Sequence, residues 1–426
     1  MSSDHLLTLK RPATNSSMNV ERWAVIAASI FLFILPITHT VALRLLCLVV
    51  MLSVVAYAWW RNPPPSIPCK WPLLLWASLC WASLLWSIEP NYSFGELTNE
   101  VGYTIITYFA FYYLTRSQDD WRIWRTTLLT SLCAISIYAI YNYAKHGTWW
   151  TAGRVGDRNA YSTYVTLMMP FLILAITQAG IGLRKHQLSW LAVPLALISG
   201  YLTLNRIMWP TLIIVAVVFF VLYWQKTLID KRSRRIGIAA LLLICTLSAA
   251  QFWFVSHQKI VPVEGATTNV QQSFSSDPRL SIWSYGISRA AERPLTGYGY
   301  GRGILRQDFR DRFGNPLFWH GHNIFLNYTL EAGIVGSIAL LVLFAAIARE
   351  FWKLYRSPNS AVWIYGLWGL TMLAAVMAKT MTDDIIIREN SLLFWAFTGM
   401  ILGLGQRAKA PIAENHQRPS DQRLPQ

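Results

Sequence analysis

Long apolar runs follow one another along almost the whole chain and are separated by short polar connections. Twelve of these runs approach the roughly 20 residues that a helix needs to cross about 30 Å of hydrocarbon. Runs of this length fit helices, whereas the strands of a membrane barrel are shorter and alternate. The pattern predicts an all-α polytopic membrane protein with about twelve transmembrane helices. Their expected cores are 22–38, 41–60, 71–86, 98–114, 124–143, 161–179, 188–204, 208–224, 236–255, 323–348, 361–379 and 389–404.

Charge divides the connections into two sets. If both termini lie in the cytoplasm, the inner loops hold fifteen Lys and Arg residues and the short outer loops hold six. Basic residues are retained on the cytoplasmic side, so this bias predicts cytoplasmic termini. It also explains most of the net charge of +16 without a nucleic-acid partner. Composition agrees, because 54% of the residues are hydrophobic and only 14% are charged, against roughly 25% charged in a soluble domain.

One outer connection, residues 257–321, is much longer than the others. It divides the chain into helices one to nine (1–256), this loop, helices ten to twelve (322–405) and a polar tail (406–426) expected to be disordered. Within the loop, "DPRLSIWSYGISRAAERPLTGYGYGRG" predicts a short amphipathic helix from about Pro278 to Glu292, with Pro294 ending it and a glycine-rich turn following. We expect this loop to carry functional residues.

A pair of histidines lies just ahead of the tenth apolar run, in "WHGHNIFLNYTLEAGIVG" (319–336). His322 precedes Gly333 by eleven residues and Gly336 by fourteen, close to three and four helical turns. On a regular helix all three would share one stripe, and small residues there would let another helix approach closely. This spacing predicts that the His322 imidazole is held in a fixed place.

The neighbours of His322 also have expected roles. Asn323 could orient an imidazole ring or a ligand, and His320 is expected to be a binding or spacer residue in the loop. Glu331 lies deeper, where a bare carboxylate is costly, so it should be protonated or paired inside the bundle. The alternative for His322 is an interfacial histidine at a helix start with no chemical role.

Several arginines gather on the outer side, where the charge bias predicts few. Arg206 lies at the end of an apolar run in "LTLNRIMWP", where an unpaired charge is costly. A cluster of guanidiniums suits a phosphate or diphosphate, whose oxygens they bind in a two-pronged manner. The candidates for diphosphate binding are Arg206, Arg279, Arg289, Arg158 and Arg154.

Structural alternatives exist for some of these arginines. Asp157 could pair with Arg154 or Arg158, and Asp277 could pair with Arg279. No outer loop carries the Asp-x-Asp pair that would hold a divalent metal. We therefore expect no metal and no cofactor, with arginine neutralising the anionic group instead.

These residues resemble a known family. "HNIFLNYTLEAGIVG" fits the His-(Asn/Ser/Gln)-x9-Gly-x-x-Gly pattern of the bacterial O-antigen ligases. "DPRLSIW" and "RPLTGYGYG" resemble the Arg-x-x-x-Trp and Pro-Leu-x-Gly-x-Gly run of the wider ligase and O-antigen polymerase superfamily, and "LNRIMWP" resembles its arginine at an outer helix end. Twelve spans and a long loop between the ninth and tenth also agree with that superfamily.

The resemblance implies a GT-C-type glycosyltransferase in the inner membrane of a Gram-negative bacterium, with its active site facing the periplasm. It would move O-polysaccharide from undecaprenyl diphosphate to the lipid A-core in lipopolysaccharide biosynthesis. His322 would be the general base, and Arg206 and Arg279, with Arg289 or Arg158, would stabilise the leaving diphosphate. The reaction would invert the anomeric configuration without a metal. Membrane lipids are the other expected partners.

Three alternatives remain open. An O-antigen polymerase would use a second lipid-linked glycan as acceptor, and a protein O-oligosaccharyltransferase would usually carry a larger outer domain after the last span. A lipid-linked glycan transporter would keep the arginines but would have no use for a base. Outer aromatic residues could stack on sugars or form an interfacial belt; they are Trp283, Tyr298, Tyr300 and Trp319.

Overall fold

The protein is described by a computed structural model, and all the regular elements among the residues that it describes are helices. That part is residues 15–409 apart from 62–65, 118–120, 152, 178–186, 228–230, 259–277, 316–317 and 383–387. The α-helices are α1 (Asn15–Ile34), α2 (Val41–Arg61), α3 (Lys70–Ala82), α4 (Pro90–Glu96), α5 (Tyr103–Ser117), α6 (Trp121–His146), α7 (Arg158–Thr177), α8 (Gln187–Leu202), α9 (Met208–Lys226), α10 (Lys231–Gln258), α12 (Pro278–Glu292), α13 (Arg306–Phe313), α14 (Ile324–Tyr355), α15 (Ser360–Thr380) and α16 (Arg388–Lys409). A 3₁₀ turn, η1 (Ser83–Trp86), follows α3, and a π-helical turn, η2 (Leu97–Gly102), joins α4 to α5.

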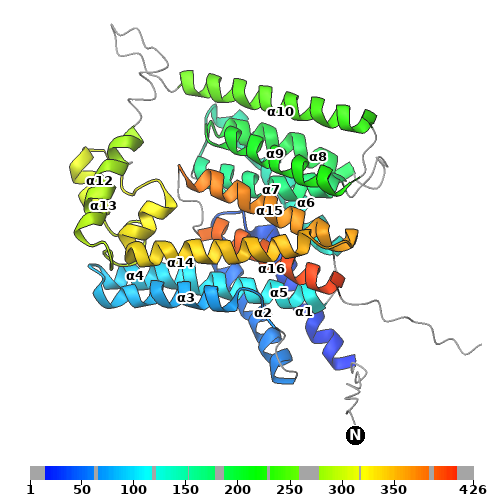
Figure 1. The fold of residues 1–426 in the computed structure, drawn as a ribbon, viewed down its shortest axis with the longest axis horizontal. Helices are drawn as coiled ribbons and strands as arrows, with labels where there is room; N and C mark the ends of the chain where they lie inside the picture. Colours follow the sequence, from blue (N-terminus) through cyan, green and yellow to red (C-terminus); the bar gives the residue numbers. More distant parts are fainter. Residues whose placement is uncertain are drawn as a thin grey trace, which may run out of the picture.

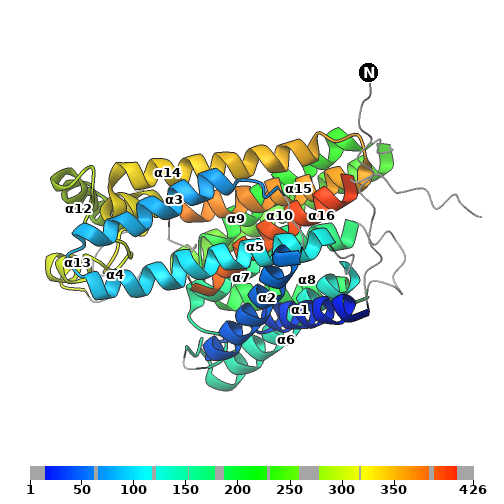
Figure 2. The same cartoon turned by 90° about the horizontal axis from the view of Figure 1, so that it is seen from below.

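Most of the long helices lie side by side in an elongated bundle, and α12 and α13 sit together at one end of it (Figure 1). The view from below shows the same arrangement, with α3, α5, α14, α15 and α16 running along the bundle (Figure 2). We call this end the α12 end; there α14 and α16 begin and α15 finishes.

Seven of the described helices are long and apolar enough to cross a bilayer, which identifies a polytopic membrane protein. The other five predicted spans also coincide with helices, but α3, α5 and α8 have only 13, 15 and 16 residues. The seven are α2, α6, α7, α9, α14, α15 and residues 237–254 of α10. A total of twelve spans stays a prediction.

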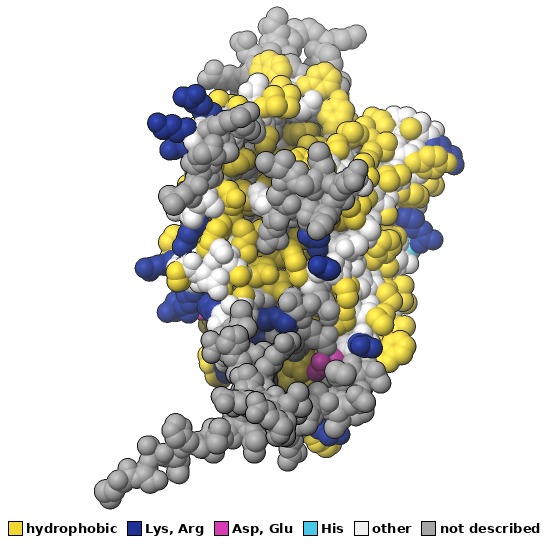
Figure 3. Space-filling view, turned by 90° about the vertical axis from the view of Figure 1, so that its right-hand side faces the viewer, with side chains coloured by type: hydrophobic (Ala, Val, Ile, Leu, Met, Phe, Trp, Pro, Cys, Tyr) yellow, Lys and Arg dark blue, Asp and Glu magenta, His cyan; other side chains and the backbone are white. Residues whose placement is uncertain are grey.

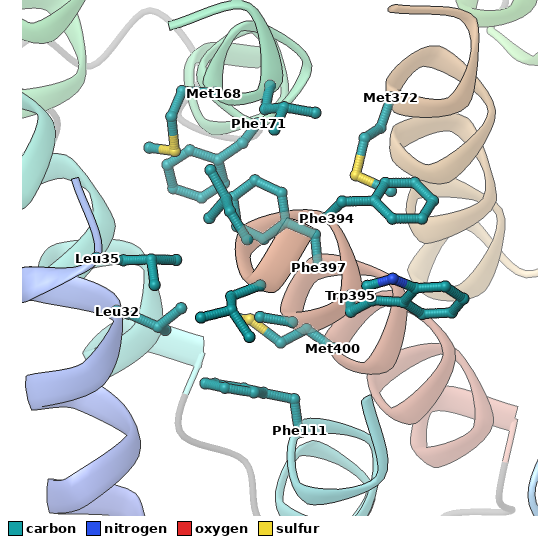
Figure 4. Packing of buried hydrophobic residues seen from close by; sticks show 14 of the residues in the cluster. Leu32, Leu35, Phe111, Met168, Phe171, Met372, Phe394, Trp395, Phe397 and Met400 are labelled. Atoms are coloured by element: carbon teal, nitrogen blue, oxygen red, sulfur yellow. The ribbon is translucent and has the colours of Figure 1, made fainter. Parts of the chain in front are cut away.

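Helix α16 forms the centre of the bundle, because every residue from 390 to 405 is buried. Its buried side chains face Phe111 of α5, Phe171 of α7 and Met372 of α15 (Figure 4). The closest approach is to α5. A Cβ at Gly399 would lie 2.6 Å from the Tyr108 carbonyl, so only glycine permits this separation.

The end of the bundle opposite α12 is rich in basic side chains. Lys and Arg side chains surround this face, and few acidic groups are visible among them (Figure 3). The sequence-based assignment of this end to the cytoplasm therefore agrees with where the basic side chains gather, but the orientation itself stays a prediction. Of the expected tail, residues 406–426, the first four belong to α16, which continues to Lys409. The remaining residues lie outside the described part of the chain.

The long connection between α10 and α14 contains two helices. The first, α12, covers the residues for which two flanking prolines predict a helix. The second, α13, was not anticipated, because its sequence "RQDFRDRF" has only two hydrophobic residues to reveal a periodic face. Phe309 of α13 is buried against Tyr285 of α12, with ring centroids 5.1 Å apart, so the two helices form a small unit with its own apolar core.

Candidate functional site

Helix α14 begins after the histidine pair and not with it. Asn323 is the N-cap: its side-chain oxygen accepts hydrogen bonds from the backbone N–H groups of Phe325 and Leu326 at 3.0 and 3.1 Å. Its amide nitrogen donates to the Met381 carbonyl at 2.9 Å. Asn323 was expected to orient a ring or a ligand, but both ends of its amide hold the helix start against the turn after α15.

His322 lies just before this cap in the left-handed region, with φ 49°. Its backbone N–H donates to Nδ1 of His320 at 3.1 Å, and the two imidazole rings have centroids 3.9 Å apart. His320 is buried and His322 is partly exposed. Because Nδ1 of His320 accepts a hydrogen bond, a neutral His320 carries its proton on Nε2.

A short series of ring contacts supports His320 on its other side. The Trp319 ring lies 4.4 Å from the His320 ring, and the Arg302 guanidinium lies 4.7 Å above the Trp319 ring. The prediction that His320 is a binding or spacer residue stays a prediction, and the contacts of its ring add a structural role. It is a buried support for the turn that presents His322.

Helix α14 is interrupted eleven residues after His322. Ala332 has φ −127° and ψ 16°, and Gly333 has φ 70° and ψ −178°, a region that only glycine visits readily. We call residues 324–331 the outer segment and residues 334–355 the inner segment. The expected stripe of His322, Gly333 and Gly336 on one regular helix is therefore wrong.

The two segments lie against each other across the break. The Ser337 hydroxyl donates to the Phe325 carbonyl at 2.9 Å and lies 2.8 Å from the Thr329 hydroxyl. In a straight helix, twelve residues would separate Ser337 from Phe325 by about 18 Å. The outer segment is consequently folded back beside the first turn of the inner segment.

The segment that approaches Gly333 is a loop and not the helix that the sequence led us to expect. We call Pro294–Gly299, within "PLTGYG", the glycine loop. Its Tyr298 and Gly299 N–H groups donate to the carbonyls of Leu330 and Glu331 at 2.7 and 3.0 Å. These are carbonyls that the break releases from helical pairing. The side chain of Glu331 is buried in the bundle, as expected.

Three hydroxyl and carboxyl groups meet beside the outer segment. The Tyr300 hydroxyl lies 3.5 Å from a carboxylate oxygen of Glu100 and 3.3 Å from the Tyr328 hydroxyl. Tyr300 is buried, so it packs inside the protein and does not offer a ring to a sugar. Sequence reasoning missed Glu100, although an acid within an apolar run is a signal in its own right.

Arg206 lies in the turn between α8 and α9 and is partly buried. The adjacent Asn205 donates to the Ser162 hydroxyl at 2.9 Å. The ammonium of Lys379, at the end of α15, donates to the same hydroxyl at 2.8 Å. Lys379 is one of the six basic residues that the sequence assigns to the short outer loops, but its side chain is fully buried. The turn that contains Arg206 therefore adjoins a buried cation.

Arg279 and Arg289 both belong to α12 but have different surroundings. Arg279 lies in the first turn and is partly exposed, and its alternative partner Asp277 lies outside the described residues. Arg289 forms ion pairs with Asp308 at 2.7 Å and with Glu292 at 2.5 Å. Hydrogen bonds from Tyr298 and Arg289 hold the pKa of Glu292 below its usual range. The charge of Arg289 thus already joins α12 to α13.

Arg154 and Arg158 are both exposed before and at the start of α7. Asp157, which could have paired with either, accepts hydrogen bonds from the N–H groups of Asn159 and Ala160 at 2.8 Å and caps α7. The Arg154 carbonyl accepts from the Thr38 N–H at 2.9 Å. The Arg158 guanidinium donates to the Thr148 hydroxyl at 3.5 Å, and unlike Arg289 it forms no ion pair with a carboxylate among the described residues.

Metal ligands were not expected in the outer loops. Among the residues that the structure describes, no three His, Cys, Asp or Glu side chains are grouped so that they could hold a metal ion. Asp383 and Asp384 lie outside these residues.

The chain shares sequence with proteins that join polysaccharides. It is 26% identical over 129 residues to a Rickettsia conorii protein whose name reads "Putative polysaccharide ligase"; the match covers 29% of this chain and 31% of the relative. A family model described as O-antigen ligase matches residues 191–341. That range includes Arg206, α12, α13, the histidine pair and the break in α14. Residues 191–341 are thus similar in sequence to the O-antigen ligase family, and the match lies over the part of the chain that holds the candidate site.

Proposed function

We propose that this protein is a glycosyltransferase of the GT-C type that transfers O-polysaccharide from undecaprenyl diphosphate to the lipid A-core. The observation that carries the proposal is the setting of His322. Its imidazole is partly exposed at the α12 end, and its backbone is fixed by the buried ring of His320. A base that must meet an acceptor hydroxyl needs both access and a fixed position.

In the proposed reaction, His322 takes the proton of an acceptor hydroxyl. The hydroxyl oxygen bonds to the anomeric carbon of the donor as the bond from that carbon to the diphosphate breaks. Undecaprenyl diphosphate leaves with the electron pair, and the proton on His322 later passes to solvent. Direct displacement of this kind inverts the anomeric configuration, and no covalent enzyme intermediate is required.

The leaving diphosphate needs positive charge at the same end of the bundle. Arg206 and Arg279 are our candidates, because Arg206 follows Asn205, whose amide shares the Ser162 hydroxyl with the buried Lys379, and because Arg279 lies in the first turn of α12. Arg158 and Arg154 are exposed and remain secondary candidates. Arg289 suits the role less well because two carboxylates already balance its charge.

The proposed location is the inner membrane of a Gram-negative bacterium, with both termini in the cytoplasm and the α12 end in the periplasm. The basic side chains at the opposite end support this orientation (Figure 3). The proposed membrane setting also explains why both substrates would be lipid-linked, since each could then reach the α12 end by diffusing in the bilayer.

A reconstitution tests the function. The purified protein in liposomes would be mixed with lipid-linked O-polysaccharide and lipid A-core, and the joined product would be separated on a gel. We expect product only when both substrates are present. Longer glycan chains formed from the donor alone would instead indicate a polymerase, and glycan attached to an added periplasmic protein would indicate an oligosaccharyltransferase. Donor movement across the bilayer without any joining would contradict an enzyme.

A further inference from the structure

His322 lies two residues before the outer segment of α14, and the inner segment does not determine the direction of the outer segment. Ala332 and Gly333 interrupt the helix between them, and the Ser337–Phe325 hydrogen bond shows that the two segments are folded together. A feature outside α14 must therefore help to set where the outer segment points.

The glycine loop makes backbone contacts on both sides of the break. Tyr298 and Gly299 donate to the carbonyls of Leu330 and Glu331 at the end of the outer segment. The N–H of Ile334, the first residue of the inner segment, donates to the Pro294 carbonyl at 2.8 Å. One loop thus joins the outer segment to the inner segment through three hydrogen bonds.

Two glycines make this contact possible, one on each side. A Cβ at Gly297 would lie 2.6 Å from the Leu330 carbonyl oxygen, and a Cβ at Gly333 would lie 2.1 Å from the Leu295 carbonyl oxygen. Both glycines have positive φ, at 66° and 70°. Because each obstacle is backbone, no side-chain movement could make room for a methyl group.

We infer that the glycine loop is the element that positions His322, with Gly297 and Gly333 as its positioning residues. This inference rests on the proposed function, because it assumes that His322 is the base. The loop fixes the outer segment, and the outer segment fixes Asn323 and the turn that presents His322. The same loop follows α12 directly, so the base and Arg279 are held by connected parts of one chain segment.

The inference predicts a specific kinetic signature. A displacement of about 1 Å in a reacting group can cost about 10²-fold in rate. Gly297→Ala and Gly333→Ala should therefore lower kcat by about 10- to 100-fold while leaving the KM for the lipid-linked donor nearly unchanged. A variant that only lowered the amount of folded protein would lower the yield and not the kcat per folded molecule.

Gly314→Ala is the matched control. Gly314 follows α13 with φ 59°, so alanine there must also adopt a positive φ, as at Gly297, but no atom lies within 4 Å of its Cβ position. We expect normal kcat and KM. A loss of kcat equal to that of Gly297→Ala would show that backbone conformation alone is responsible and would overturn the inference.

A second-site rescue separates the loop contact from the shape of the break. A Cβ at Gly336 would lie 2.5 Å from the Cβ of Ala332, within α14 itself. Ala332→Gly should therefore rescue Gly336→Ala but should not rescue Gly333→Ala, whose obstacle is the Leu295 backbone. Rescue of Gly333→Ala by Ala332→Gly would contradict positioning by the loop.

Hydrogen–deuterium exchange of residues 324–331 provides a measurement that needs no activity. The inference predicts faster exchange there in Gly297→Ala than in the wild type and unchanged exchange in Gly314→Ala. If the wild-type protein transferred no glycan, the proposed function would fail while this exchange result could still hold. Unchanged exchange together with unchanged kcat in Gly297→Ala would overturn the inference and leave the proposed function standing.

Discussion

The Ser337 hydroxyl donates a hydrogen bond to the carbonyl of Phe325, which lies twelve residues earlier in the same helix, α14. This bond places the first turn of the inner segment beside the start of the outer segment. The consequence for the site is that His322 precedes a short folded-back segment and not a straight transmembrane helix.

Replacement of His322 provides the direct test of the proposed base. We expect His322→Ala to insert and fold normally but to lose about 10²- to 10⁴-fold in kcat, because a positioned base typically contributes that much. Steady-state transfer measured with purified protein would show it. Near-normal product formation by this variant would refute the assignment.

The hydrogen bond from the His322 N–H to His320 can be tested by replacing His320 with residues whose amide takes the place of either Nδ1 or Nε2. In His320→Asn the side-chain oxygen lies near the place of Nδ1 and can still accept from the His322 N–H, whereas in His320→Gln the amide corresponds more closely to Nε2. We expect kcat to fall in His320→Ala and His320→Gln and to recover partly in His320→Asn. A binding or spacer residue, as the sequence predicts for His320, would be expected to show only a mild effect in His320→Ala. Equal activities of the Asn and Gln variants would argue against the hydrogen-bonded support.

The arginines that we assign to the diphosphate should not tolerate lysine. Lysine keeps the charge but loses the two-pronged donor geometry, and each charge-assisted contact is worth roughly 1.5 to 3 kcal/mol, or about ten- to a hundredfold. We expect Arg206→Lys and Arg279→Lys to weaken donor binding by that factor. Arg310→Lys, at an exposed position of α13, is the control and should bind donor normally. Lost stability with unchanged donor affinity would assign both arginines a structural role.

Chelation tests whether arginine takes the place of a metal. With the diphosphate held by arginine, transfer should persist in excess chelator, because no divalent ion neutralises the leaving group. The measurement is the initial rate before and after prolonged treatment with chelator. Loss of the rate, with recovery on addition of magnesium or manganese, would contradict a metal-independent reaction.

Acid should loosen the contact between α12 and the glycine loop through Glu292, whose carboxylate accepts a hydrogen bond from the Tyr298 hydroxyl at 3.0 Å. Its pKa in the folded protein is lower than the ordinary value of 4.5, so its hydrogen bonds stabilise the contact above that pH and are lost as the pH falls through the lowered pKa. Spin labels at the exposed Ile287 and Ile334 would report a distance distribution that broadens below that pH. Glu292→Gln should broaden it at neutral pH and remove the dependence on pH. A variant that kept the wild-type pH dependence would show that another group is responsible.

Sequence patterns predicted the helical architecture well because the membrane imposes length and apolarity on each span separately. The same holds for α12, whose ends follow from Pro278 and Pro294. The break at Gly333 was missed because a glycine in an apolar run looks the same in a straight helix and in an interrupted one. Its cause lies in the glycine loop, 36 residues before it, and only the folded chain brings Leu295 against Gly333.

Charges were the least predictable part of the site. Lys379 ends an apolar run and therefore resembles an ordinary flanking residue, yet it is buried against Ser162, 217 residues away in the chain. The partner of Arg289, Asp308, lies in a helix that the sequence did not reveal. Which charges are already balanced depends on tertiary contacts, so residue type and spacing could nominate the arginines but could not rank them.

The break in α14 separates two tasks that a single continuous helix would have to share. The inner segment has 22 residues and is about 33 Å long, which is enough to cross the hydrocarbon by itself. The eight residues of the outer segment are therefore not needed to satisfy the length of the bilayer. Substitutions there should lower the rate of transfer by displacing His322, and they should leave insertion into the membrane intact.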